Sequence, residues 1–153
     1  MRVVIFTIVV AVLVMGGLSP RAGDPLDPML SPEAAVHIQL RALQNNDVPS
    51  PDSGIRKAWA FAHPDNKRLT GPLPKFMAMI KQPAYAMLLN HQNHEIKLLE
   101  RSASIAVFAI RVTANDGLVY LCRWQVAPVS GGENDGAWLT IGVSPLMAVG
   151  KET

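Results

Sequence analysis

Two side chains near the middle of the chain have the types best suited to chemistry. His91 follows the segment that holds Tyr85 and precedes a predicted strand, where the chain could direct an imidazole into a pocket. Such an imidazole would act as a general base or bind a ligand by hydrogen bonds, with the Tyr85 hydroxyl as a donor. The alternative, which we favour, is that both side chains only secure a corner between helix and strand.

The sequence HQNHE at residues 91–95 superficially suggests a metal site. His91 and His94 are three residues apart beside Glu95. The helical zinc patterns need HExxH or its inverse HxxEH, and this spacing provides neither. The glycine-rich residues 130–136 connect two predicted strands and lack the lysine and helix of a phosphate-binding loop. We therefore predict no metal and no cofactor.

Two further residues are candidates for a pocket. Arg123 shares a predicted strand face with Arg111, which would meet an anionic ligand if that face lined a pocket. The alternatives are a solvated surface and a dimer interface. Trp138 lies opposite the apolar side of its strand, as a pocket wall, a subunit contact or, as we favour, a packing residue. The candidate pocket thus consists of Tyr85, His91, Arg123 and Trp138.

The elements that must position these residues begin with helices. Apolar residues recur at helical spacing, and Ser31 followed by Pro32 is a typical helix start. The sequence HPDN after the second helix is interpreted as a turn. Helices are predicted for residues 31–45, 53–62 and 73–82, with a short helical turn at 84–89.

The second half of the chain has the alternation of strands, predicted for residues 95–99, 105–113, 118–126 and 137–143. A three-residue loop with Gly117 in the left-handed conformation aligns the apolar faces of the second and third strands. It pairs Val112 with Tyr120, Ile110 with Cys122, and Phe108 with Trp124. Helices followed by an antiparallel meander predict an α+β fold, with N-terminal helices packed on a curved antiparallel sheet.

Residues 1–22 are predicted to be a targeting segment. Arg2 precedes an uninterrupted run of apolar or small residues at 3–18. We favour a signal peptide cut after Ala22, which predicts a periplasmic or secreted protein. The alternative is a signal anchor that tethers the chain to a membrane through residues 3–18. Residues 23–30 are interpreted as a linker, 31–146 as a single domain and 147–153 as a tail.

Charge and cysteine content exclude some classes of partner. The chain has 14 Lys plus Arg and 12 Asp plus Glu, and a cleaved signal would remove Arg2 and Arg21. The remaining chain is neutral and has no basic footprint for nucleic acid or an anionic membrane. Cys122 is the only cysteine, so no intrachain disulfide forms, and we expect its side chain to be buried.

Four segments resemble a known family. SPEAAVHIQLRALQNND, TGPLPKF, PAYAMLLNH and GAWLTIGVSP follow one another between Ser31 and Pro145. They are similar to successive landmarks of an uncharacterised family, domain of unknown function 4864. The resemblance implies a cone-shaped nuclear-transport-factor-2-like or cystatin-like fold, with a pocket between sheet and helices. Since that superfold hosts isomerases, dehydratases, binding subunits and dimeric scaffolds, it implies no single activity.

Three hypotheses for function follow. A non-catalytic exported or membrane-tethered module would bind an unknown small ligand or a protein partner, and the lack of a convincing acid and base favours it. An isomerase or dehydratase using His91 and Tyr85 is the alternative, and it predicts a deep cavity with His91 inside. A homodimer formed through the sheet face of Arg111 and Arg123, with Trp138, is the third.

Overall fold

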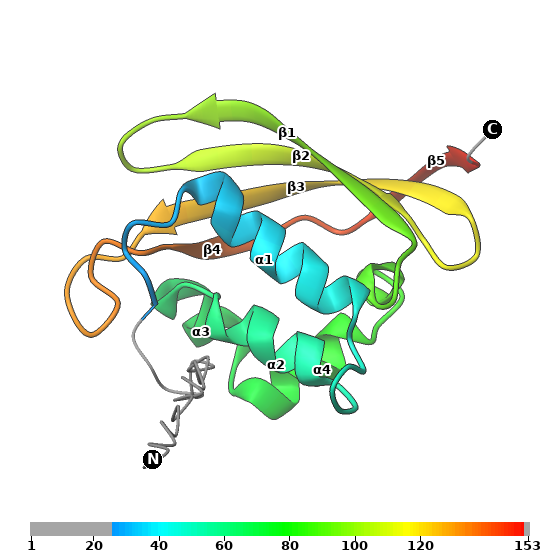
Figure 1. Ribbon diagram of the computed structural model, residues 1–153, viewed down its shortest axis with the longest axis horizontal. Coiled ribbons are helices and arrows are strands. Elements are labelled where there is room, and N and C mark those ends of the chain that lie inside the picture. Colours follow the sequence, from blue (N-terminus) through cyan, green and yellow to red (C-terminus); the bar gives the residue numbers. More distant parts are fainter. Residues whose placement is uncertain (1–25, 152–153) are drawn as a thin grey trace, which may run out of the picture.

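Helices cover one face of an antiparallel sheet in the computed structural model, which describes residues 26–151. Figure 1 shows the helices below the twisted sheet, with α1 lying directly against it. The predicted α+β class, with N-terminal helices packed on an antiparallel sheet, is confirmed. The targeting segment predicted for residues 1–22 lies outside the described residues. None of the helices within residues 26–151 has the length and apolar content needed to cross a membrane.

Three of the helices occupy the predicted places. Ser31 caps the first helix, because its Oγ accepts a hydrogen bond from the Ala34 backbone N–H at 3.1 Å. Pro32 fits the first helical position, where no backbone N–H is needed. These helices are α1 (Pro32–Gln44), α2 (Ser53–Ala60) and α4 (Leu73–Ile80), followed by the short 3-10 turn η1 (Ala86–Leu88).

One further helix, α3 (Pro64–Thr70), corrects the prediction that HPDN is only a turn. The His63 Nδ1 atom accepts a hydrogen bond from the Asp65 N–H at 3.1 Å, so His63 caps the helix. Pro64 fits the first turn because its fixed φ is helical. Gly71 ends the helix with a φ of 82°, a conformation that glycine adopts without strain. The turn prediction was wrong because the same residues also suit a helix start.

The sheet consists of β1 (Asn93–Arg101), β2 (Ala106–Thr113), β3 (Leu118–Pro128), β4 (Trp138–Val143) and β5 (Met147–Lys151). Its order is β1-β2-β3-β4, and β5 also pairs with β3. The predicted hairpin register is confirmed, with Phe108 opposite Trp124 and Val112 opposite Tyr120. Gly117 has a φ of 80° in the connecting loop, as predicted.

The ends of the domain differ from the sequence-based boundaries. Residues 147–151, expected to be part of a tail, form β5, which pairs antiparallel with the first part of β3. Because β4 covers only the second half of β3, β5 supplies hydrogen-bond partners that the first half would otherwise lack. At the other end, Leu26 and Leu30 of the predicted linker pack against a small apolar cluster.

The main core lies between the helices and the sheet. It contains fully buried side chains from α1, α2 and the inner faces of β2 and β3, including Leu40, Ile55, Phe108 and Ile110. Cys122 is buried among them, as expected, and burial raises the pKa of its thiol to about 12. This thiol is therefore un-ionised at neutral pH and serves as a small apolar side chain.

The segment that joins α2 to α3 is attached to the edge of β4. The Thr140 N–H donates to the Phe61 carbonyl at 2.9 Å, and the His63 N–H donates to the Thr140 carbonyl at 2.8 Å. Ala62 thereby forms a parallel bridge with Thr140. This attachment holds α2 and α3 beside β4 and frames the space described next.

Candidate functional site

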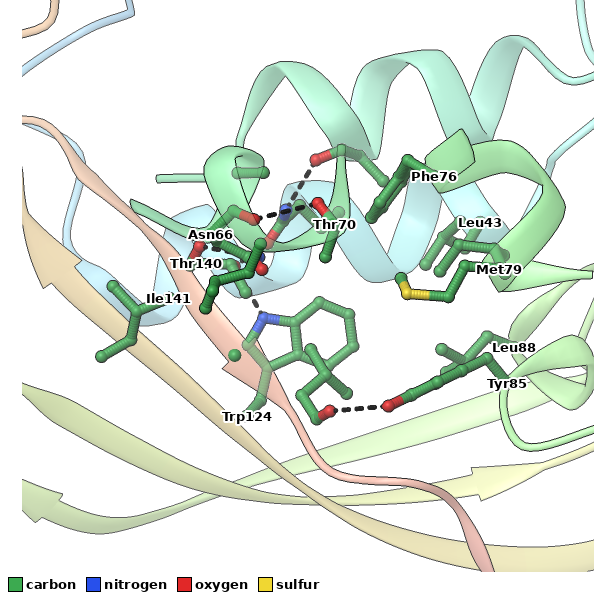
Figure 2. Close-up of a pocket in the computed structure, with 17 residues that line it drawn as sticks. Leu43, Asn66, Thr70, Phe76, Met79, Tyr85, Leu88, Trp124, Thr140 and Ile141 are labelled. Atoms are coloured by element: carbon green, nitrogen blue, oxygen red, sulfur yellow. Dashed lines mark hydrogen bonds between the residues drawn. The ribbon is translucent and has the colours of Figure 1, made fainter. Parts of the chain in front are cut away.

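A cavity of about 260 Å³ lies between β4 and the helices α2, α3 and α4 (Figure 2). Most of its wall is apolar. Trp124 of β3 forms one side, and Phe76 and Met79 of α4 lie across from it. Pockets of this character, apolar with a few polar groups between a sheet and helices, are typical ligand sites.

The wall of the cavity contains almost no ionisable group. Of the 17 residues that line it, Tyr85 alone can titrate, since none is Asp, Glu, His, Lys, Arg or Cys. The half-buried Tyr85 hydroxyl donates a hydrogen bond to the Val143 carbonyl at 3.2 Å. The cavity therefore holds no carboxylate, imidazole or amine to act as a general base.

A buried chain of hydrogen bonds fixes the back of the cavity. The Trp124 indole N–H donates to Thr140 Oγ1 at 2.8 Å, and the Thr140 hydroxyl donates to Gln39 Oε1 at 2.5 Å. The Gln39 amide in turn donates to the Ala58 carbonyl at 2.8 Å. Because every link is satisfied, the indole ring is held as a rigid wall.

Helix α3 forms the side of the cavity nearest to solvent. None of its residues is buried, and Leu69 is 80% exposed although it lines the cavity. The Asn66 side-chain N–H donates to the Thr140 carbonyl at 3.2 Å, which ties the helix to β4. The Thr70 hydroxyl donates to the Asn66 carbonyl at 3.0 Å, within the helix. Few packed contacts therefore hold this wall in place.

Met79 is the lining side chain that lies across the cavity from Trp124 (Figure 2). It is partly buried and packs against the main core cluster. A larger side chain there would extend into the space between α4 and the indole ring. Gly142 does not offer the same route, because it pairs with Gln125 and its Cβ would therefore lie on the face of the sheet opposite to Trp124.

His91 is buried but does not line the cavity. Its Nδ1 lies 2.6 Å from the Leu88 carbonyl, which can only accept, so Nδ1 carries the proton. Its Nε2 lies 2.7 Å from His94 Nδ1 and accepts a hydrogen bond from it. Burial lowers the pKa of His91. The structure thus separates His91 from the cavity that Tyr85 lines and places it at the corner between η1 and β1.

The two other predicted pocket residues also lie elsewhere. Arg123 is exposed on the outer face of the sheet, and its strand neighbour in register is Ala109. Trp138 is half-buried and packs against the main core cluster. Of the four candidates, Tyr85 alone lines the cavity. Among residues 26–151 no three His, Cys, Asp or Glu side chains are grouped to hold a metal ion.

Sequence reasoning missed most of the cavity because its wall is built from side chains that resemble ordinary core. Phe76 and Trp124 fit the apolar patterns of a helix and a strand, but nothing in their spacing shows that a space is left between them. The polar residue Thr140 is the one available signal, since it falls on a strand otherwise rich in apolar residues. Its hydrogen-bond partner Gln39 is remote in the sequence, so this polar residue can be interpreted only when the fold is known.

Fold and site together define an α+β domain in which helices close one face of an antiparallel sheet around an apolar cavity. A family model described as "Domain of unknown function (DUF4864)" matches residues 30–153. The chain belongs to this family. No curated protein and no solved structure matches the chain. The family description carries no activity, so function has to be argued from the cavity.

Proposed function

We propose that this domain is a non-catalytic module that binds a small, mostly apolar molecule in the cavity beside Trp124 and β4. The supporting observation is the 260 Å³ cavity itself, which exceeds the roughly 150 Å³ apolar space known to bind benzene in an engineered protein. Burial of an apolar ligand against such walls is favourable by about 25 cal/mol per Å² of apolar surface removed from water.

The composition of the lining supports binding over catalysis. An isomerase or dehydratase needs a positioned base, and Tyr85, the one titratable lining residue, already donates its proton to a backbone carbonyl. His91 has both ring nitrogens engaged outside the cavity. No observation on the cavity favours the enzyme hypothesis.

A titration with naphthalene, followed by NMR of the labelled protein, tests the proposal. We expect shifts concentrated at residues of the lining, including the Trp124 indole N–H and the Met79 methyl group. The variant Met79→Trp should abolish the shift of the Trp124 indole N–H, because its larger side chain occupies the space across from Trp124. Ser130→Trp is the matched control, since this exposed residue lies in the β3–β4 connection outside the cavity lining. Unchanged binding by Met79→Trp would exclude this cavity as the site.

The location of the domain belongs to the same proposal. The apolar run at residues 3–18 after Arg2 supports export, with release after Ala22 or retention as a membrane anchor. Mass spectrometry of the protein from its native cell decides between the two. A mature chain that begins at Gly23 means release, and a full-length chain in the membrane fraction means anchoring. A full-length chain in the cytosol would contradict both.

A further inference from the structure

We infer that the ligand of the cavity is a neutral molecule whose polar end donates a hydrogen bond, such as an alcohol, a phenol or an N–H group, and not a carboxylate. This inference rests on the proposed function and adds the chemical class of the ligand. The class is set by which polar atoms of the lining already have hydrogen-bond partners within the protein.

The hydroxyl and indole hydrogens of the lining are all engaged within the protein. Thr70 donates to the Asn66 carbonyl, Thr140 donates to Gln39 Oε1, and the Trp124 N–H donates to Thr140. The Tyr85 hydroxyl donates to the Val143 carbonyl. A ligand that accepts a hydrogen bond from one of these hydroxyl or indole groups would have to break the existing link, and that would leave a partner unsatisfied.

Oxygen lone pairs remain free on three side chains of the lining, those of Asn66, Thr70 and Tyr85. The Asn66 side-chain N–H donates to a carbonyl, which fixes the amide orientation and turns Oδ1 away from Thr140. Within residues 26–151, Asn66 Oδ1 accepts no hydrogen bond, and Thr70 Oγ1 and Tyr85 Oη keep lone pairs because each acts as a donor. Figure 2 shows Asn66 and Tyr85 on either side of the Trp124 ring. Both ends of the cavity therefore present acceptors to the ligand.

A carboxylate would find little compensation in this cavity. None of the 17 lining residues carries a positive charge. The donors that remain are the second amide hydrogens of Asn66 and Gln39, and Gln39 is itself 3% exposed and held at both ends. One neutral amide does not replace the water lost by a buried anion. A hydroxyl group has no such penalty and can donate to a free oxygen lone pair.

Three probes with the same ring system test the class directly at pH 7, namely 2-naphthol, naphthalene and 2-naphthoate. One hydrogen bond contributes about 0.5–1.5 kcal/mol net, so we expect 2-naphthol to bind about 3- to 10-fold more tightly than naphthalene. We expect 2-naphthoate to bind more weakly than naphthalene. Equal affinity for the first two, or tighter binding of the carboxylate, would overturn the inference and leave the proposed function standing. If none of the three binds, the proposed function fails and the inference fails with it.

Three variants locate the acceptor. Tyr85→Phe, Asn66→Leu and Thr70→Val each remove one free oxygen and keep a side chain of similar size. At least one of them should abolish the preference for 2-naphthol over naphthalene, measured as the ratio of the two affinities in the same variant. Tyr120→Phe is the matched control, because the chain has two tyrosines and Tyr120 does not line the cavity. A preference that survives all three cavity substitutions, made singly and together, would contradict the assignment.

Discussion

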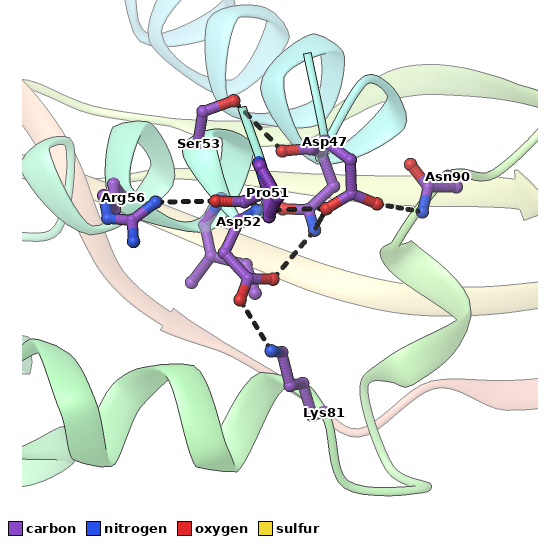
Figure 3. Close-up of polar contacts among 9 residues, drawn as sticks. Asp47, Pro51, Asp52, Ser53, Arg56, Lys81 and Asn90 are labelled. Atoms are coloured by element: carbon purple, nitrogen blue, oxygen red, sulfur yellow. Dashed lines mark hydrogen bonds and ion pairs between the residues drawn. The ribbon is translucent and has the colours of Figure 1, made fainter. Parts of the chain in front are cut away.

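Asn46 is the side chain on which the connection between α1 and α2 depends. It is buried, and its Oδ1 accepts from the Ile55 N–H at 3.0 Å. Its amide donates to Asp47 at 3.0 Å and to Asp52 at 3.2 Å. Figure 3 shows how the two carboxylates extend this network, Asp52 to Lys81 of the α4 end and Asp47 to Asn90. The hydrogen bond from Lys81, followed by that from Asn46, lowers the pKa of Asp52.

Replacement of Asn46 should make the protein unfold at a lower denaturant concentration. We expect Asn46→Ala to lower the free energy of unfolding by about 1–3 kcal/mol, because the Ile55 N–H is left without a partner in a buried place. Urea denaturation measures the change. The adjacent Asn45→Ala is the control, since that exposed side chain bonds only to the Arg41 carbonyl and should change stability much less. Equal effects of the two substitutions would contradict this role.

The pair of His91 and His94 should make stability depend on pH. Burial first, and then the neighbouring His91, His37 and Arg41, lower the pKa of His94 to about 4. Since both histidines have pKa values below the usual 6.5, the unfolded chain binds more protons in mildly acidic solution. Their contribution is complete above about pH 6.5 and is lost as the pH falls towards 4.

Urea denaturation at pH 7 and pH 5 isolates this effect, because carboxylates with pKa values near 4 stay largely ionised at both. We expect the free energy of unfolding to be lower at pH 5 than at pH 7. In His94→Gln, whose amide can still donate to His91 Nε2, the difference should shrink. A difference of the same size in the variant would assign the pH dependence to other groups.

At the scale of elements, the backbones of α1 and α2 lie close together at Gly54. A Cβ at this position would lie 2.1 Å from the Ala42 carbonyl oxygen, which belongs to the backbone and cannot rotate away. The Gly54 N–H also donates to the Asn46 carbonyl at 2.9 Å. The crossing of the two helices therefore requires a residue without a side chain.

We expect Gly54→Ala to lower the free energy of unfolding by about 1–3 kcal/mol through overpacking. Gly142→Ala is the matched control, because its Cβ would meet no heavy atom within 4 Å. Thermal denaturation of the two variants should show a large drop in Tm for the first and little change for the second. An unchanged Tm in Gly54→Ala would mean that the two helices can move apart without loss of stability.

The elements also show where sequence patterns suffice. The register of β2 and β3 was predictable because a short loop with Gly117 leaves one pairing that aligns both apolar faces. Helix α3 was not predictable, since its exposed residues have no apolar stripe and its first residues also suit a turn. Strand β5 was not predictable, because all five of its residues are exposed and its pairing partners in β3 are 26 or more positions away. Local sequence patterns predict elements that bury one face, and neither α3 nor β5 buries a face.

At the scale of the whole molecule, the cavity depends on contacts that no local pattern contains. Thr140 joins α1 through Gln39 and the α2–α3 connection through Phe61 and His63. Tyr85 was predicted as a pocket residue and lines the cavity, while His91 belongs to a separate corner. The family match assigns residues 30–153 to the family described as a domain of unknown function. The nuclear-transport-factor-2-like superfold remains a prediction.

The central claim, that the cavity beside Trp124 binds a small apolar molecule, is tested most directly by intermolecular nuclear Overhauser effects with naphthalene. We predict effects from the ligand protons to the Met79 methyl group and the Trp124 ring, which face each other across the cavity. Effects confined to exposed apolar residues such as Leu121 and Met147 of the sheet would contradict it.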